Sequence, residues 1–342
     1  MNITPFAVKP AQHQHHILHT LIIVILFCAG GCSSPVFNHE SSLSSLSGEA
    51  ILTGADVRNQ ALQLIQSANH SLYIEQLTLD DPVMLNEIIA KAQSGVKVKI
   101  LLDRWQRENA STLEQLKNNN ISAQYYPTEK GQYHCQKFII ADSRTVLFVS
   151  APWSSSHAPY SAIALNMTGD TVQKALDLFA HDWQYTTTLE PDITRLTYIP
   201  EKITLTSTSG IKNLILSHIE SAHQTIWIET QHLSSDEIVN ALIAAQKRGC
   251  EIRIFLDASC QETIPNTLNT LTDAHIEYRF HNNPEEILYR NFAVFDTCSL
   301  VYTSSAWVYN TFVINHEGAL AIPSPSAARK CAEIFQADWE NG

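Results

Sequence analysis

The sequence predicts an α/β protein that contains two copies of one folding unit, and two observations support this prediction. Residues 67 to 153 reappear at 221 to 307 with a constant offset of 154, as Lys99–Asp103 and Arg253–Asp257 illustrate. The matches continue over almost ninety residues without a gap, which marks an internal repeat. Helical and strand patterns also alternate within each copy, as they do in α/β folds. The natural place for a binding site is therefore the boundary between the copies.

The first copy is expected to form a helix, a strand, a helix, a strand, a helix, three strands and a closing helix. Apolar residues recur with helical spacing from Asp56 to Ser67, and residues 72 to 79 are typical of a strand. A second helical stripe ends at Gly95, and the alternating residues 96 to 100 predict a strand that enters a buried sheet. The other expected elements are a helix from Thr112, strands near 121, at 137 to 141 and at 145 to 149, closing helices that end with residues 179 to 183 and 335 to 339, and a connection at about 184 to 209.

Length and charge limit the possible function classes. The chain has 342 residues, a formal net charge of −12 and a pI near 5.6. This length fits two units of roughly 150 residues each. A sequence-independent nucleic-acid binder would present a basic face to phosphates, so the acidic balance argues against nucleic acid as a partner.

The N-terminal segment is predicted to direct export. A short apolar run at 21 to 27 precedes the small residues Ala29-Gly30-Gly31 and then Cys32, which looks like a bacterial lipoprotein signal. We expect residues 1–31 to be removed, Cys32 to carry lipid, and the Ser-rich segment 32–50 to act as a flexible tether. A plain signal peptide or an uncleaved anchor is the alternative, although a spanning helix needs roughly 20 apolar residues. The expected location is a bacterial membrane, at its periplasmic face or at the cell surface.

The five cysteines that follow the N-terminal segment do not indicate a metal site. They are odd in number and show no CxxC or other metal-ligand spacing, so the sequence predicts neither a zinc site nor a disulfide framework. One pair could bridge in an oxidising compartment, and the sequence does not say which. No metal and no cofactor is expected. These cysteines are Cys135, Cys250, Cys260, Cys298 and Cys331.

One segment resembles a known family. Cys135–Asp142, followed by Ser150–Ser154, is similar to the motif region of the phospholipase D superfamily, which carries two H-x-K-x-x-x-x-D motifs, each followed by a G-S-x-N-W-like turn. The resemblance extends from about Ile51 to Trp339 and includes the F-x-x-D-W closing helices. It implies an α/β fold of two tandem phospholipase D-like sandwich repeats, at 51–190 and 191–342, related by a pseudo-twofold axis.

The motif residues depart from the family pattern. In the family one histidine attacks phosphorus, the other protonates the leaving group, and the lysines hold the phosphoryl oxygens. Here Lys137 is kept, but Cys135 stands in the first histidine position. Tyr289 and Asn291 stand in the histidine and lysine positions of the second motif. His134 comes one place early and would face away from Lys137 unless a β-bulge intervened, so it is the alternative nucleophile.

These replacements predict degenerate catalysis. A phenol with a pKa of about 10 is a poor base at neutral pH. Cys135 could attack as a thiolate, or it could fill the space that the histidine vacated. Lys137, on an inward face, needs an anion, which could be a phosphate or carboxylate ligand or the side chain of Glu317. The supporting motif positions are Asp142, Ser150, Asp296, Ser304 and Glu317.

The N-terminal signal predicts a lipid-anchored protein, and the resemblance implies a cleft between its repeats for a phosphate group or a phospholipid head group. The alternative is an active phosphodiesterase or phosphatidyltransferase of the phospholipase D or cardiolipin synthase type, acting on membrane phospholipids. An exported nuclease is a third possibility, which the acidic charge disfavours. The expected partners are a membrane phospholipid or another phosphodiester, and the membrane surface. The oligomeric state stays open.

Overall fold

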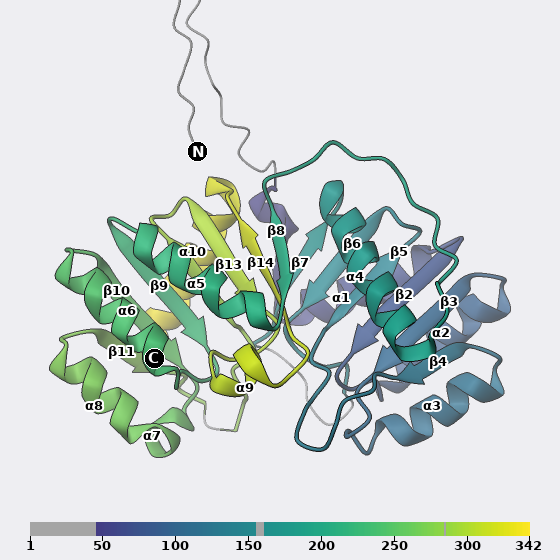
Figure 1. Ribbon diagram of the computed structural model, residues 1–342, viewed down its shortest axis with the longest axis horizontal. Helices are drawn as coiled ribbons and strands as arrows, with labels where there is room; N and C mark the ends of the chain where they lie inside the picture. Colours follow the sequence, from purple (N-terminus) through teal and green to yellow (C-terminus); the bar gives the residue numbers. More distant parts are fainter. Residues whose placement is uncertain (1–45, 155–160, 284) are drawn as a thin grey trace, which may run out of the picture. The chain divides into compact units, whose positions relative to one another are not determined.

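A computed structural model of the chain describes residues 46–154, 161–283 and 285–342. Two repeats follow one another along these residues, each with one mixed sheet and its own helices (Figure 1). A short 3₁₀ helix, η1 (Gly48–Ala50), precedes the first repeat. The first repeat contains β1 (Ile51–Thr53), α1 (Ala55–Ser67), β2 (Ser71–Gln76), α2 (Pro82–Gln93), β3 (Lys97–Leu102), α3 (Asn109–Asn118), β4 (Ser122–Tyr125), β5 (Phe138–Ala141), β6 (Thr145–Val149), β7 (Ile163–Met167) and α4 (Asp170–Thr187).

The second repeat begins with β8 and ends with the longest helix of this repeat, α10. Its elements are β8 (Thr204–Ser207), α5 (Ser209–Ser221), β9 (Thr225–Thr230), α6 (Asp236–Lys247), β10 (Glu251–Leu256), α7 (Cys260–Thr263), α8 (Pro265–Asp273), β11 (Glu277–Phe280), β12 (Phe292–Phe295), β13 (Ser299–Thr303), α9 (Tyr309–Val313), β14 (Gly318–Ile322) and α10 (Pro325–Asn341).

The two sheets have matching topologies. The strand order of the first sheet is β1-β7-β6-β5-β2-β3-β4, and that of the second is β8-β14-β13-β12-β9-β10-β11. Written in this direction, each strand stands at the position of its counterpart. Ile74 of β2 faces Ile139 of β5, and Ile228 of β9 faces Ala293 of β12, so the register follows the offset of 154. The α/β fold with two tandem repeats is thus confirmed.

Strand alternation divides each sheet between two hydrophobic clusters. In β5, Phe138 and Ile140 join a central cluster, whereas Ile139 joins a cluster formed by the first repeat alone. The central cluster also contains Phe292 of β12 and Phe335 of α10. Burial of one such phenylalanine contributes about 1.5–3 kcal/mol. The two repeats are therefore stabilised by one shared core.

The motif aspartates fix the entry of a strand in each repeat. The carboxylate of Asp142 accepts backbone N–H bonds from Asn69, His70 and Ser71, at distances of 2.7 to 3.2 Å. Partial burial works to raise the pKa of Asp142, but these N–H groups outweigh it and the pKa is lowered overall. Asp296 plays the same part before β9, where it accepts from the backbone of residues 223 to 225.

The structure adds strands that the sequence patterns did not reveal. β1 has three residues, and β8 is a polar, half-exposed edge strand inside the expected connection, so neither shows a clear alternation. β7 is almost fully buried and follows the turn after Trp153. The five cysteines at positions 135 to 331 are free. Within the described ranges, none of the helices combines the length and the apolar character needed to cross a membrane.

Candidate functional site

The first motif places its lysine in a closed interior position. Lys137 is 4% exposed, and its ammonium donates to the carbonyl oxygens of Cys135 at 3.0 Å and Ser304 at 2.6 Å. The cavity beside it, lined in part by Tyr302 and Gly318, measures about 10 Å³. That volume has room for about one water molecule at most. The positive charge is thus held by backbone dipoles of both repeats.

The buried side chain of Glu317 lies near Cys135 and Ser304. Its Oε2 accepts the hydroxyl of Ser304 at 2.5 Å, and its Oε1 accepts the amide of Asn315 at 3.1 Å. Burial, followed by the nearby Glu317, raises the pKa of the Cys135 thiol well above its usual value. A thiol that stays protonated is a weak nucleophile. Cys135, Lys137, Ser304 and Glu317 therefore come together, but without an ionised nucleophile.

The second motif uses its polar side chains within its own repeat. The side-chain oxygen of Asn291 accepts from the hydroxyl of Thr230 at 2.9 Å and from the backbone N–H of Gln231 at 3.0 Å. Its amide donates to the carbonyl oxygen of Tyr289 at 2.9 Å. Burial raises the pKa of the Tyr289 phenol, whose ring packs against the cluster of the first repeat. In the turn after the first motif, the hydroxyl oxygen of Ser150 likewise accepts a hydrogen bond within its own repeat, from the backbone N–H of Ile163 at 2.9 Å.

His134 points away from this region. Its ring is fully buried, and its Nε2 lies 3.3 Å from Oε2 of Glu75. Its backbone N–H donates to Asp103 at 2.7 Å, which fixes the loop before β5. Burial, and then the neighbouring His316, lowers the pKa of His134 well below its usual value. The neutral imidazole is thus the stable form.

A second histidine reaches His134 from the other repeat. His316 stacks on Tyr126 with ring centroids 4.5 Å apart, and Tyr126 in turn stacks on His134 at 4.6 Å. Nε2 of His316 lies 2.6 Å from Oδ2 of Asp182 in α4. The backbone joins the same segments, because Cys135 donates to the carbonyl of His316 at 2.8 Å. We refer to Glu75, Asp182, His134 and His316 as the carboxylate–histidine cluster.

The sequence interpretation did not find this cluster, apart from His134. Its members come from β2, α4 and two loops, so no short spacing connects them. One signal was present: Glu75 and Glu229 match at the offset of 154, and Asp182 and Asp338 each precede the closing tryptophan of their repeat.

The second repeat has an arginine at the equivalent place. There Arg290 lies between the two matching carboxylates, with Nε 2.6 Å from Glu229 and Nη2 2.6 Å from Asp338. Burial raises the pKa of Glu229 to about 7, although Arg290 opposes the shift. At the position that matches Arg290, the first repeat has Gln136.

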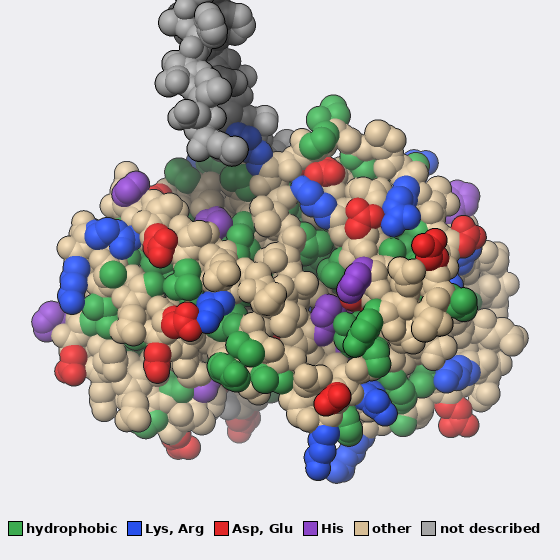
Figure 2. Space-filling view, in the orientation of Figure 1, with side chains coloured by type: hydrophobic (Ala, Val, Ile, Leu, Met, Phe, Trp, Pro, Cys, Tyr) green, Lys and Arg blue, Asp and Glu red, His purple; other side chains and the backbone are tan. Residues whose placement is uncertain are grey.

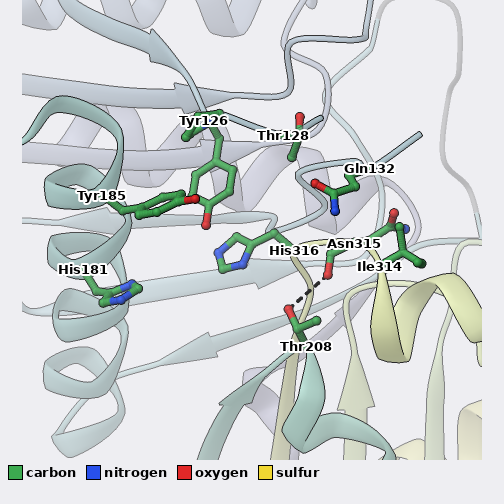
Figure 3. Close-up of a pocket in the computed structure, with 10 residues that line it drawn as sticks. Tyr126, Thr128, Gln132, His181, Tyr185, Thr208, Ile314, Asn315 and His316 are labelled. Atoms are coloured by element: carbon green, nitrogen blue, oxygen red, sulfur yellow. Dashed lines mark hydrogen bonds between the residues drawn. The ribbon is translucent and has the colours of Figure 1, made fainter. Parts of the chain in front are cut away.

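A pocket opens beside the carboxylate–histidine cluster at the boundary between the repeats (Figure 3). Its volume is about 330 Å³. His316 and Tyr126, from different repeats, both line it, and the Thr208 hydroxyl donates to the backbone carbonyl oxygen of Asn315 at 3.0 Å. The lining residues are Tyr126, Pro127, Thr128, Gln132, His181, Tyr185, Thr208, Ile314, Asn315 and His316.

Two tandem α/β repeats, each with a segment that resembles the phospholipase D motif, define a phospholipase D-like class of protein. The chain belongs to the phospholipase D superfamily, because residues 61–183 and 215–339 match the family described as cardiolipin synthase, PLD-like domain.

Curated relatives match part of the chain. A phospholipase D of Rickettsia prowazekii (strain Madrid E) is 28% identical over 134 residues, which are 39% of this chain and 63% of the relative. A mitochondrial cardiolipin hydrolase of Danio rerio is 23% identical over 126 residues, 37% of this chain and 56% of the relative. The chain thus spans less than two thirds of either relative.

Solved structures support the same fold. A phosphatidylserine synthase of Haemophilus influenzae Rd KW20 matches 86% of each chain, with a TM-score of 0.66 and 14% identity. A polyphosphate kinase of Porphyromonas gingivalis matches 82% of this chain and 44% of its own, with a TM-score of 0.60 and 18% identity.

Proposed function

We propose that this chain is a non-hydrolysing member of the phospholipase D superfamily that binds a phosphate-containing group, such as a phospholipid head group, between its repeats. One observation carries the proposal. Of the four positions that hold histidine and lysine in the family motifs, only Lys137 is kept, and its ammonium is bound by two backbone carbonyls. The family's two-step mechanism needs one nucleophile and one group that titrates near neutral pH, and these positions supply neither.

The pocket at the repeat boundary is the better place for the ligand. The cavity at Lys137 is too small for a phosphate group, whereas the pocket of about 330 Å³ is much larger and has both polar and apolar side chains in its lining. Its lining includes His181, whose exposed imidazole can donate to a ligand. Phosphate oxygens accept such bonds, most strongly from a protonated imidazole.

Features around the pocket fit a lipid surface. Tyr185, at the pocket, is 61% exposed, and Tyr309 and Val313 of α9 are 62% and 49% exposed. Hydrophobic side chains gather on the face shown in Figure 2 over the region of α9. Aromatic side chains of this kind suit the membrane interface. We further propose that lipid on Cys32, which lies outside the described residues, holds the protein at a bacterial membrane.

Hydrolysis is tested first. Purified protein is expected to cleave phosphatidylcholine, phosphatidylglycerol and bis(p-nitrophenyl) phosphate no faster than a Cys135→Ala, His134→Ala double variant. Restoring the family residues with Cys135→His, Tyr289→His and Asn291→Lys together is expected to create measurable turnover, provided that circular dichroism shows a folded protein. Turnover by the unmodified chain that requires Cys135 would contradict the proposal.

Binding is tested on vesicles. We expect phosphatidylglycerol vesicles to bind His181→Ala about threefold to tenfold more weakly than the unmodified protein, the loss of one exposed hydrogen bond. His223→Ala, at an exposed site in the second repeat, is the matched control. Glycerophosphoglycerol as a competitor separates head-group recognition from general membrane adhesion. Equal binding by all three proteins would remove the pocket from the proposal.

A second candidate rests on the histidine pair. His134 and His316 come from different repeats, with ring centroids 5.4 Å apart, and each has a carboxylate neighbour. An active phosphodiesterase could use them as nucleophile and acid. Turnover that disappears with His134→Ala alone, and also with His316→Ala alone, would favour this candidate.

A further inference from the structure

We propose that Glu75, His134 and His316 bind a divalent transition-metal ion, with Zn²⁺ as the preferred ion and Asp182 as the neighbouring fourth donor. The potential ligand atoms of Glu75, His134 and His316 all lie within 4.8 Å of one another. The proposal does not depend on the function proposed above, because it concerns the interior side of the pocket wall.

The cluster contains buried polar atoms that make no hydrogen bond of standard geometry. Glu75, His134 and Asp182 are fully buried. Neither carboxylate oxygen of Glu75 and neither ring nitrogen of His134 makes a hydrogen bond of standard geometry to the described residues. Buried groups of this kind are costly unless they are paired or bind a metal. A cation at this place would satisfy both side chains at once.

The second repeat supplies an internal comparison. Glu229 and Asp338 hold the guanidinium of Arg290 between them, so two buried carboxylates share a permanent cation. The matching carboxylates of the first repeat, Glu75 and Asp182, have no arginine or lysine partner in the described part of the chain. Gln136, at the matching position, is neutral. The first repeat therefore keeps the two carboxylates, and in place of the cation it has two imidazoles, His134 of its own and His316 of the second repeat, which are metal ligands.

The donor set fits zinc. Two imidazole nitrogens and one or two carboxylate oxygens form a common zinc environment, whereas Ca²⁺ and Mg²⁺ prefer oxygen ligands alone. Tetrahedral ligands about 2.0–2.1 Å from zinc lie roughly 3.3 Å apart. The distance from His134 Nε2 to Glu75 Oε2 is 3.3 Å. His316 Nε2 lies closer than that to Asp182, at 2.6 Å, so this pair would separate by less than one ångström on binding.

The metal would reach the cluster through the pocket. His316 is the member that lines the pocket, and its side chain is 14% exposed, whereas the other three members are fully buried. Rotation of the Tyr126 side chain, which stacks on both histidines, would open a path from the pocket to the cluster.

The experiment uses the full-length chain, produced without export so that residues 1–31 are retained, and it first removes a competing source of metal binding. The N-terminal segment contains four closely spaced histidines, and these are replaced by glutamine in the parent protein. They are His13, His15, His16 and His19. The parent is incubated with ZnSO₄, dialysed and analysed for bound zinc by mass spectrometry. We expect one zinc ion per chain, and a rise in Tm with Zn²⁺ that EDTA reverses.

Variants locate the ion. Glu75→Gln and His134→Gln are expected to weaken zinc binding by about 100-fold or more, since changes to residues that only hydrogen-bond to metal ligands already weaken binding about 10- to 100-fold. Glu114→Gln and His70→Gln, both at exposed positions, are the matched controls and should bind as the parent does. Without metal, Glu75→Gln should have a higher Tm than the parent, because it removes a fully buried carboxyl group that lies close to the carboxyl group of Asp182. Zinc binding that persists in a folded His134→Gln variant would overturn the proposal.

A measurement on the parent alone covers the case in which a variant fails to fold. X-ray absorption of the zinc-loaded parent should show two imidazoles and only nitrogen or oxygen donors. A spectrum with a sulfur donor, or a parent that binds no zinc at micromolar free Zn²⁺, would mean that protons alone balance the cluster, and the proposal would be wrong.

Discussion

Arg290 offers the sharpest test of the electrostatic reasoning, because its side chain is 9% exposed and holds two carboxylates. The substitution Arg290→Met keeps much of the volume but removes the charge. Both Glu229 and Asp338 then lose their cation at contact distances of 2.6 Å. Breaking a buried ion pair by removal of one partner costs about 3–5 kcal/mol. That is a large share of the 5–15 kcal/mol that stabilises a typical folded protein.

The loss of folding stability caused by Arg290→Met should become smaller as the pH falls. Without Arg290 the carboxyl groups can stay buried only by binding protons, so their pKa values in the folded protein rise further above the unfolded values. A group whose pKa is raised by folding loses its stabilising effect as the pH rises through the folded pKa. Protonating one carboxyl group costs about 1.4 kcal/mol for each pH unit above its ordinary pKa. Between pH 7.5 and pH 5.5 the loss should therefore shrink by up to about 2.7 kcal/mol per proton bound.

Urea unfolding followed by tryptophan fluorescence measures this effect at both pH values. Arg195→Met is the control, because it breaks an exposed pair with Asp177 and should cost less than about 1 kcal/mol. Arg290→Met combined with Glu229→Gln should recover part of the loss. A loss below about 1 kcal/mol at pH 7.5, or a loss that grows on acidification, would refute the reasoning.

Three further predictions concern single residues. Asp142→Asn should lower stability above about pH 4 and flatten the acid limb of unfolding, because the lowered pKa of Asp142 gives stability that is lost as pH falls through the folded value; parallel acid limbs for both proteins would argue against this. Lys137→Met should cost about 1–3 kcal/mol in urea unfolding because two buried carbonyls lose their donor, whereas Lys97→Met, at an exposed ion pair, should change stability little. Cys32→Ser should release the protein from membranes on cell fractionation, and intact mass should show the missing lipid; an unmodified, soluble mature chain in the parent strain would contradict the lipidation proposal.

The sequence predicted the fold well, because a repeat in fixed register constrains every strand and helix at once. The structure pairs Ile228 with Ala293 at an offset of 154 from the pair Ile74–Ile139, as the repeat requires. The site was harder to predict, since side chains meet there across the repeat boundary. The motif pattern drew attention to Lys137 and Cys135, yet the carboxylate–histidine cluster depends on how α4 and the loop before β14 approach β2. Local periodicity contains no information on such an approach.

The shared central core determines how the chain should behave when it is cut between its repeats. Phe138 of one repeat and Phe292 of the other are packed in the same cluster, and the segment before β5 is hydrogen-bonded to the segment before β14. Neither half could bury its inner sheet face alone. Cutting the connection between α4 and β8 should therefore leave two fragments that remain associated and melt together, as a non-covalent dimer of half-length chains would.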